Sequence, residues 1–338
     1  MDSVELSAKI GAMIVGAAVR GGADRGELLA RTGFDPSLAS DPDTKISLEL
    51  ESALWNEGAR LTGDDAFGLH AAEHVEPGAF DVLDYAVRTA PTLRAALERL
   101  ARYNRLLHDA AVFTLTDRPP VVRLEHSFKR QQGRQSRHAA EFTLASIVVV
   151  GAALVGQPLE PTRVEFAHAP PSAAVLDEHR RIFARPPSFA QPVNALELDT
   201  ALLARPIPHA DPALSRVLER HAEALLAALP PERETTTERV RQLLSKTLGD
   251  AAPSLADTAA RLKLGERSLQ RKLADEGCSF ESLLDEVRQS LALRYLADRS
   301  LAIAEVAYLL GYSEPSPFHR AFKRWTGKTP SEARGRAA

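Results

Sequence analysis

Apolar residues recur with helical spacing along several stretches of the first 230 residues. Residues 48–61 and 92–107 carry them three or four positions apart, and residues 139–155 form a longer, almost wholly apolar run. This spacing predicts helices, with a shorter one at 176–183 and an amphipathic one at 212–229. One face of the last helix should carry most of its large side chains, which are Leu214, Val217, Leu218, His221, Leu225 and Leu229.

Shorter segments of the same region have the period of two that is typical of strands. Residues 112–115 and 121–124 flank Asp117-Arg118-Pro119-Pro120, which predicts a hairpin, and residues 163–166 and 195–198 predict two further strands. The N-terminal region is therefore expected to be an α+β domain with an antiparallel sheet. A β-rich barrel would need many more short strands.

A polar segment with two prolines, residues 229–237, marks the clearest domain boundary. Proline cannot continue a helix, and the segment has nothing to bury. We predict an N-terminal domain at 1–229, a linker at 230–237 and a C-terminal all-helical domain at 238–338.

The first half of the C-terminal domain has the pattern of a helix, a short turn and a second helix. Ser254, with Asp257 three residues later, predicts an N-cap for the first helix. Residues 263–266 form the turn, with Leu264 as its apolar plug, and residues 267–276 form the second helix, which Gly277 should end. The inward residues of these helices should be Leu255, Ala259, Leu262, Leu269 and Leu273.

The second half repeats this pattern. Residues 303–310 predict a helix that ends at Gly311, and Ser313 should cap the next helix, with Pro315 in its first turn. Phe318, Phe322 and Trp325 should point inward, and Gly327 should end the helix.

The outward residues of the two second helices are hydrogen-bond donors. Arg can pair with guanine and Gln with adenine in the major groove, while Lys and other Arg residues hold phosphates. These residues are Arg267, Ser268, Gln270, Arg271 and Lys272 in the first helix and Ser316, His319, Arg320, Lys323 and Arg324 in the second. The alternative is a pair of merely solvated faces, which would suffice for one isolated helix.

A connecting helix of about 19 residues separates the two halves. One apolar stripe runs along it, formed by Phe280, Leu283, Leu284, Val287, Leu291 and Tyr295. A helix of this size is about 28 Å long, so it could hold the two outward helices close to one turn of DNA apart, about 34 Å.

Residues 254–335 closely resemble the DNA-binding domain of AraC/XylS-type transcription regulators. The resemblance rests on residues 269–277, on residues 303–313 and above all on the long motif at 318–330. It implies two helix-turn-helix units joined by one helix. It also implies base contacts from Arg267, Gln270 and Arg271 and from Ser316, His319 and Arg320.

Two positions depart from that pattern. The first turn has Lys263 and Gly265 where the family usually has Gly and Ser, which should weaken the turn slightly. The second outward helix begins at 314–317 with few long donors, so base reading there would rest on His319 and Arg320 or partly on DNA shape.

The region from about residue 34 to 229 resembles an arabinose-binding-like, ornithine-regulator-type domain of one AraC subgroup. Residues 77–92, 164–171 and 205–212 carry this resemblance, which implies sensing of a small effector or dimerisation. The chain has Phe183-Ala-Arg-Pro186 where relatives often have Phe-Gly-Cys-Pro, so it does not inherit a particular effector.

Charge is distributed unevenly. The whole chain carries −3, but residues 235–338 contain 17 Lys and Arg against 13 Asp and Glu, and the remainder contains 25 against 32. A basic C-terminal third on an acidic body fits double-stranded DNA as the partner of one domain. The chain lacks a basic start and has no apolar run of 18 residues, so we expect a cytoplasmic protein without a membrane partner.

No motif of an enzyme, metal site or cofactor site stands out. The chain has a single cysteine, Cys278, and no Gly-x-Ser-x-Gly, Walker or dinucleotide-binding motif. His70 and His74 have a spacing that can bind zinc, but Glu73 is not placed as in zincins, and we interpret them as a solvated helix end. The remaining histidines considered are interpreted as scattered core or surface residues rather than ligands, and these are His126, His138, His168 and His179.

The sequence thus predicts a DNA-binding transcription regulator, not an enzyme, that forms a homodimer and responds to a small molecule. Residues 139–155 could line the ligand cavity or form the dimer face. RNA polymerase is a further candidate partner. The competing hypothesis is a small-molecule-binding or catalytic N-terminal domain to which the DNA-binding region is an accessory.

Overall fold

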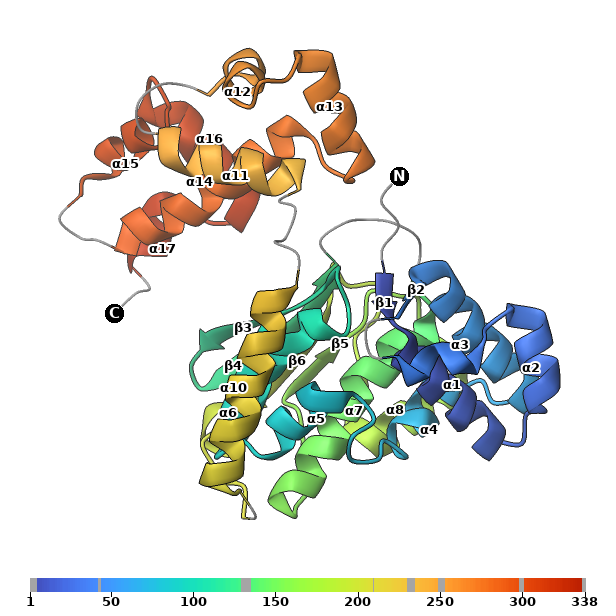
Figure 1. Cartoon of the computed structure of the whole chain (residues 1–338). Coiled ribbons are helices and arrows are strands. Elements are labelled where there is room, and N and C mark those ends of the chain that lie inside the picture. Colours follow the sequence, from blue (N-terminus) through green and yellow to red (C-terminus); the bar gives the residue numbers. More distant parts are fainter. Residues whose placement is uncertain are drawn as a thin grey trace. The chain divides into compact units, whose positions relative to one another are not determined.

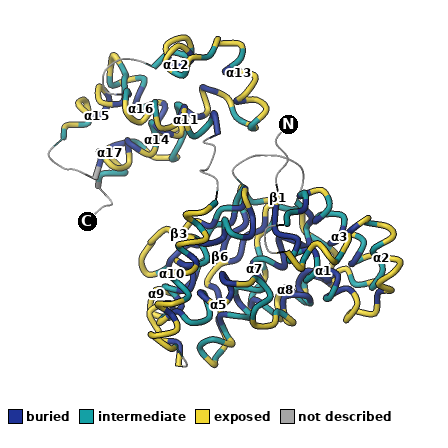
Figure 2. Tube along the Cα trace, in the orientation of Figure 1, coloured by how far each residue is buried: buried dark blue, intermediate teal, exposed yellow. Residues whose placement is uncertain are grey.

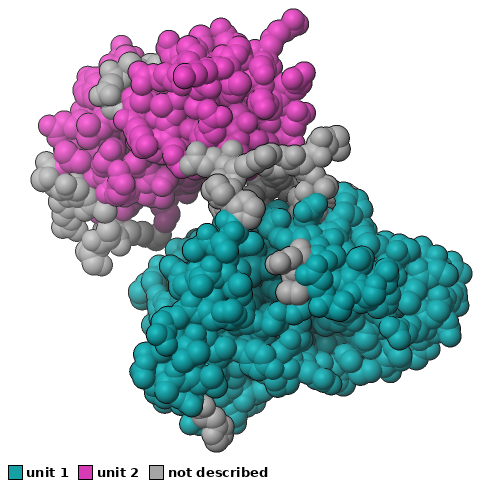
Figure 3. Space-filling model, in the orientation of Figure 1, with its two compact units in different colours: residues 1–230 teal, residues 231–338 magenta. Residues whose placement is uncertain are grey.

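The computed structural model describes residues 5–41, 44–128, 135–208, 210–229, 235–248, 253–297 and 301–335. The chain divides into two compact units, Met1–Pro230 and Pro231–Ala338 (Figure 3). Each unit has its own cluster of buried apolar side chains, and Figure 2 shows the buried segments gathered inside each of them.

Unit 1 mixes helices and strands, as the sequence predicts. Its elements are β1 (Glu5–Ser7), α1 (Ala8–Arg20), α2 (Arg25–Thr32), η1 (Pro36–Ser40), β2 (Lys45–Ser47), α3 (Leu48–Thr62), α4 (Phe67–Ala72), α5 (Asp81–Arg88), α6 (Leu93–Tyr103), η2 (Asn104–Leu106), β3 (Ala111–Arg118), β4 (Val121–Phe128), α7 (Arg137–Val155), β5 (Arg163–Glu165), α8 (Ala173–Phe183), β6 (Asn194–Asp199), α9 (Thr200–Leu203) and α10 (Pro212–Ala228). Helices α1 to α3 gather on one side of this unit and the larger sheet lies on the other (Figure 1).

The larger sheet is antiparallel, in the order β3-β4-β6-β5. The predicted hairpin is confirmed and is longer than expected, since β3 and β4 pair from Ala111 opposite Phe128 to Arg118 opposite Val121. Alternate residues of a strand face opposite sides. Val122 and Leu124 therefore face the apolar core, while Arg123 lies on the other side.

Helix α7 is the central helix of unit 1, and α4 lies close against it. A Cβ at Gly68 would come within 2.1 Å of the carbonyl oxygen of His138, so only glycine allows this approach. Helix α7 is also long and apolar enough to cross a membrane by length and composition, yet half of its apolar window is buried inside the unit. Glu141 in its first half is fully buried, which suits a core helix.

Unit 2 is helical throughout its described residues. Its helices are α11 (Thr236–Thr247), α12 (Leu255–Arg261), α13 (Glu266–Asp275), α14 (Phe280–Ala297), α15 (Ile303–Leu309), α16 (Pro315–Thr326) and α17 (Pro330–Gly335). Its core is formed mainly by the predicted inward residues, with Leu269, Leu273, Phe318 and Phe322 fully buried.

Two features of the region around the linker differ from expectation. Residues 230–234 lie outside the described residues, but Thr236 and Thr237, which we expected in the linker, already belong to α11. Thr235 and Glu238 form a reciprocal capping box that starts this helix. Helix α10 forms as predicted, but Leu214, Val217 and Leu225 on its apolar face are 47%, 52% and 38% exposed.

Candidate nucleic-acid interface

The first helix-turn-helix unit consists of α12 and α13. Ser254 accepts a hydrogen bond from the backbone of Asp257 and caps α12, as predicted. Ala259 of α12 and Leu269 and Leu273 of α13 are buried against the unit 2 core. Gly277 follows α13 with a φ of 77°, the left-handed conformation that ends a helix.

The turn between α12 and α13 is under local strain. Lys263 has a φ of 58°, a region that a residue with a Cβ rarely adopts, and this is where the family usually has glycine. Gly265 is the N-cap of α13 and supplies no side-chain hydrogen bond. Partly buried Leu264 packs on the core, so apolar contact holds the turn despite the two departures.

Four predicted donors of the first helix-turn-helix unit lie on the outer face of α13. Arg267, Gln270, Arg271 and Lys272 are exposed, and within the part of the chain that the structure describes the three cations make no ion pair. Ser268 differs, because it is partly buried beside Leu269. The long side chains can therefore reach an outside partner, whereas Ser268 has less freedom to do so.

Glu276 fixes α13 against α11, a role that sequence reasoning missed. Its two carboxylate oxygens accept hydrogen bonds from the backbone nitrogens of Thr236 and Thr237, at 2.9 and 2.7 Å. Burial favours a higher pKa for Glu276, but these hydrogen bonds outweigh it and the pKa is lowered. A carboxylate at a helix N-terminus is also favoured by the helix dipole. Helix α11 therefore anchors the end of the exposed helix.

The second helix-turn-helix unit consists of α15 and α16. Gly311 has a φ of 74° after α15, and Gly327 has a φ of 73° after α16, so both terminators are confirmed. The predicted cap at Ser313 is wrong, because Glu314 is the N-cap and makes no side-chain capping bond. Pro315 fixes the first helical position, and the cap must be the residue before it.

The outer face of α16 is less uniform than that of α13. Ser316, Arg320 and Lys323 are exposed, while His319 is half-buried, with its ring 5.9 Å from that of Phe318. Trp325, predicted to point inward, is half-buried against the core.

Helix α14 joins the two helix-turn-helix units, and polar side chains of α14 hold the second helix-turn-helix unit in place. Its predicted apolar stripe is confirmed, with Phe280, Leu283, Val287 and Leu291 buried. At 18 residues it is about 27 Å long.

Arg288 of α14 was also missed by sequence reasoning. It donates a hydrogen bond of 3.0 Å to the carbonyl oxygen of Leu310, at the end of α15, and its guanidinium lies 4.4 Å from the ring centre of Tyr312. A cation is favoured at a helix C-terminus. Asp285 pairs with Arg324 of α16 at 2.6 Å. These contacts fix the turn and the helix that follow α15, and Arg324 is thereby engaged within unit 2.

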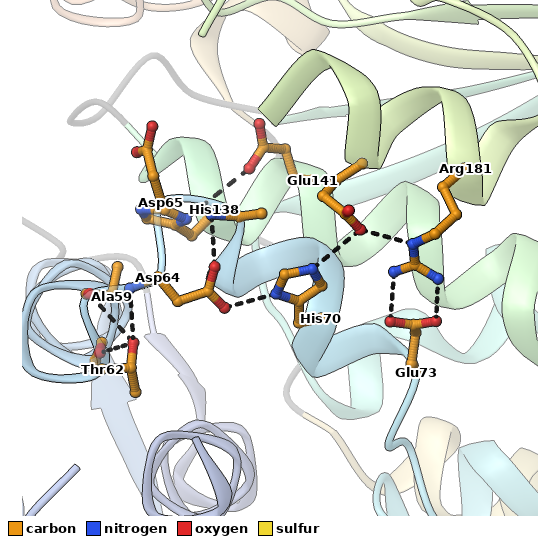
Figure 4. Close-up of polar contacts among 12 residues, drawn as sticks. Ala59, Thr62, Asp64, Asp65, His70, Glu73, His138, Glu141 and Arg181 are labelled. Atoms are coloured by element: carbon orange, nitrogen blue, oxygen red, sulfur yellow. Dashed lines mark hydrogen bonds and ion pairs between the residues drawn. The ribbon is translucent and has the colours of Figure 1, made fainter. Parts of the chain in front are cut away.

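Unit 1 holds a separate polar cluster, shown in Figure 4. His70 contacts Asp64 at 2.7 Å and Glu178 at 3.1 Å, and Arg181 binds Glu73 through two hydrogen bonds of 2.7 Å. Burial alone would lower the pKa of His70, but its hydrogen bonds with the two carboxylates raise it. His70 and His74 lie at the end of α4 and His74 is exposed, as interpreted, but both ring nitrogens of the 38%-exposed His70 side chain have partners.

Three of the four histidines that we interpreted as scattered lie around buried Glu141. The carboxylate is 3.3 Å from His179, 3.8 Å from His168 and 3.9 Å from His138. Burial lowers the pKa of His138 and His168. No group of three or more His, Cys, Asp or Glu residues among those that the structure describes is arranged to hold a metal ion.

Comparison with known proteins matches both units. The model of the arabinose-binding domain of AraC transcription regulators, N-terminal, covers residues 22–207, and a helix-turn-helix domain model covers residues 258–336. The chain is 34% identical to an ornithine utilization regulator of Pseudomonas aeruginosa, over 93% of this chain and 91% of that protein.

Two further similarities extend over nearly the whole chain. The HTH-type transcriptional regulator VirS of Mycobacterium tuberculosis is 29% identical, over 93% of this chain and 91% of that protein. Among solved structures, the transcriptional regulator CdpR from Pseudomonas aeruginosa is 27% identical, with a TM-score of 0.40, over 92% of this chain and 96% of that chain.

Proposed function

The chain belongs to the AraC family of DNA-binding transcription regulators, and on that premise we propose that α13 and α16 read a specific DNA site while unit 1 senses a small molecule and forms a dimer. The observation that carries the DNA-reading part is the set of exposed long donors on α13, a helix anchored by Glu276 and by two buried leucines. Pre-positioned donors on a rigid helix are what base recognition requires.

The two helices would contribute unequally to base reading. Arg267, Gln270 and Arg271 on α13 would contact base edges, and Lys272 would contact phosphate. On α16, Arg320 would be the main base contact, with Ser316, His319 and Lys323 around it, because Arg324 is already paired with Asp285.

The test uses the full chain and a fluorescent DNA fragment with the sequence that the wild type enriches from random DNA. Arg271→Ala and Arg320→Ala should each weaken specific binding by about 1–3 kcal/mol and relax the base preference at one position. Lys272→Ala should weaken binding to all sequences and reduce its salt dependence. Fluorescence anisotropy across a salt series measures both effects.

Arg25→Ala is the matched control, since Arg25 is an exposed arginine on α2 of unit 1. It should bind DNA like the wild type. If Arg271→Ala and Arg320→Ala also bind the specific site like the wild type, the assignment of the reading faces is wrong.

We propose that the dimer forms through α10. The inner side of this helix packs on α5 and α6 through buried Ala222 and through Glu219, which lies 3.0 Å from Arg99. Its outer side carries Leu214, Val217 and Leu225, which are exposed and fall within one arc of the helix.

A second copy of the same helix would bury this apolar arc in a two-fold symmetric contact. Dimerisation would also link two DNA-binding domains, which increases their combined affinity.

Sedimentation equilibrium tests the dimer with full-length protein. Leu214→Ser combined with Val217→Ser should weaken self-association at least tenfold, while Leu38→Ser, an exposed leucine in η1, should leave it unchanged. A wild-type chain that stays monomeric at micromolar concentration with DNA present would reject the dimer.

The sensing role would work by differential affinity. An effector shifts the placement of the DNA-binding units across the linker only if it binds one arrangement more tightly than the other. We propose a cytoplasmic regulator without catalytic activity, with RNA polymerase as a further partner. Loss of all sequence-specific DNA binding, with a reaction catalysed by unit 1, would favour the alternative of a catalytic domain with an accessory DNA-binding region.

A further inference from the structure

Unit 1 contains a half-open cavity between α5, α6, α7 and the end of β6. It encloses about 660 Å³ of empty space, its open mouth included. The space inside the walls is about 90 Å³, below the roughly 300–1,000 Å³ of sites that enclose a drug-sized molecule, so it suits a small ligand or one apolar group of a larger ligand. The walls are supplied by three helices, with Leu83 and Val87 on α5, Leu97 on α6 and Ile147 and Val150 on α7.

The cavity wall is almost entirely aliphatic. Gly151 contributes a bare stretch of α7, where a Cβ would come within 2.7 Å of a methyl group of Leu159. Leu93, Leu154 and Leu198 also line the space, and the described lining includes one aromatic side chain, that of Phe80. An aliphatic lining of this kind favours an apolar occupant over water.

The two polar side chains of the lining are already occupied. Asp84 is buried and accepts hydrogen bonds from the backbone nitrogen of Gly78 at 2.5 Å and from Arg88 at 2.9 Å to each oxygen. Ser146 donates its hydroxyl hydrogen to the carbonyl oxygen of Thr143, at 3.0 Å. Both groups therefore find their partners within the protein.

This chemistry decides between ligand classes. A sugar or an amino acid would bring hydroxyl, ammonium or carboxylate groups into the cavity, and each would lose its water without gaining a partner. A hydrocarbon chain or ring has no polar group that would lose its water, and its transfer from water to an aliphatic wall is favourable.

We infer that this cavity binds a neutral, largely hydrocarbon small molecule and that this molecule is the effector class of the protein. The assignment rests on the proposed sensing role of unit 1 and specifies its ligand. A polar end group of the ligand would lie at the open mouth, beside the partly exposed side chains of Val87, Ile147 and Val150. The site thus selects its ligand by apolar burial rather than by hydrogen bonds.

The probe for this site is N-phenyl-1-naphthylamine, a neutral dye that becomes fluorescent in apolar surroundings. The full-length chain should bind it saturably at one site per chain, and 1-decanol should displace it. L-arabinose and L-ornithine, as polar competitors, should leave the signal unchanged at millimolar concentration.

Variants locate the binding. Val150→Trp should fill the cavity and weaken dye binding at least tenfold, and Ile147→Phe is a milder filling variant that should weaken it several-fold. Ala153→Trp is the matched control, because Ala153 is exposed on the same helix and does not line the cavity. Circular dichroism and thermal melting verify that each variant is folded.

The inference is overturned by absence of saturable dye binding, by displacement with arabinose or ornithine rather than decanol, or by unchanged binding in both folded filling variants. It is also overturned if Val150→Trp weakens only self-association, which would make this face a contact between copies. The DNA affinity of the same variants, measured without decanol, separates the inferred ligand class from the proposed DNA-binding function. Intact DNA binding without a dye site refutes the ligand class alone, and a dye site without specific DNA binding refutes the proposed regulator.

Discussion

The two units differ in where their ionisable side chains lie. Unit 1 buries ionisable side chains, among them Glu51, Arg123, Glu141 and His126, each with less than a tenth of its surface exposed. Among the described residues of unit 2, the buried polar side chains are those of Thr235, Thr236 and Thr258, and its interior is otherwise apolar. The described cations of unit 2 are exposed, except Arg288 and Arg334, which are partly buried.

This difference separates two ways of building a domain. Unit 2 is stabilised by an apolar core, so its outward cations on α13 are free to serve a partner. Unit 1 depends partly on internal ion pairs, whose removal leaves an uncompensated charge in a medium of low polarity. We therefore expect unit 1 to respond more strongly to charge removal and to pH than unit 2.

The largest contrast should come from removing one arginine in each unit. Arg123 lies among three carboxylates, 2.5 Å from Glu165, 2.7 Å from Glu125 and 3.3 Å from Glu197. Arg123→Met should lower the free energy of unfolding of unit 1 by about 3–5 kcal/mol, because Glu125 and Glu197 lose this partner and buried Glu165 keeps only the more exposed Arg163. Arg324→Met breaks an exposed pair with Asp285 and should change that of unit 2 by at most about 1 kcal/mol.

Hydrogen exchange of the full chain under native conditions reports the two units separately. Equal protection losses in the two variants would contradict the contrast.

The second effect is the pH dependence of the stability of unit 1. Burial lowers the pKa of His126 to about 3, while an unfolded histidine titrates near 6.5. The unfolded state therefore binds the extra proton first, and this stabilisation, complete above pH 6.5, is lost as the pH falls toward 3. Replacing His126 with Phe should remove this dependence, so the stability difference between wild type and variant should change by about 2 kcal/mol between pH 7 and pH 5.

Comparing wild type with variant is necessary because other groups titrate in the same range. Burial raises the pKa of Glu51 to about 7, so Glu51 protonates first in the folded state and adds stability as the pH falls from 7 to 4.5. Urea unfolding followed by Trp55 fluorescence, in a Trp325→Phe background, isolates unit 1, since the chain has two tryptophans. A pH-independent difference between the two proteins would refute the role of His126.

The smallest effect lies in unit 2, at the strained turn. Lys263→Gly should relieve the positive φ and stabilise unit 2 by about 0.5–1 kcal/mol, because glycine adopts this conformation without cost. Gly22→Ala is an instructive counterpart, as it imposes the same strain on a φ of 95° in unit 1 and should destabilise that unit. Thermal melting of the full chain measures both, and a less stable Lys263→Gly variant would show that the Lys263 side chain contributes more than the strain removes.

Local signals made most of unit 2 predictable. The helix boundaries follow from capping residues and glycines close in sequence, such as Ser254, Gly311 and Gly327, and the inward faces follow from spacing. The error at Ser313 arose from choosing the better capping residue, although Pro315 fixes the cap one position later. The connections through Glu276 and Arg288 could not be predicted, since their partners lie 40 and 22 residues away.

For unit 1, the sequence predicts the fold class and most of the longer helices and strands. It does not predict which side chains contact each other. Periodicity predicts that α10 has an apolar face, yet it cannot tell whether that face meets its own domain or another chain. In the structure Ala222 faces inward and Leu214 and Val217 face outward. The grouping of His168 and His179 around Glu141 is likewise a product of tertiary packing, since they come from different segments.

We propose that this chain reads a specific DNA sequence through α13 and α16. The most direct test is to pass a pool of random double-stranded DNA over the full-length protein and to sequence the retained fragments, for wild type and for Arg271→Ala. We expect one enriched motif for the wild type and a relaxed base preference at one position of each half-site for the variant. Retained DNA without an enriched motif, or a variant motif identical to that of the wild type, would contradict it.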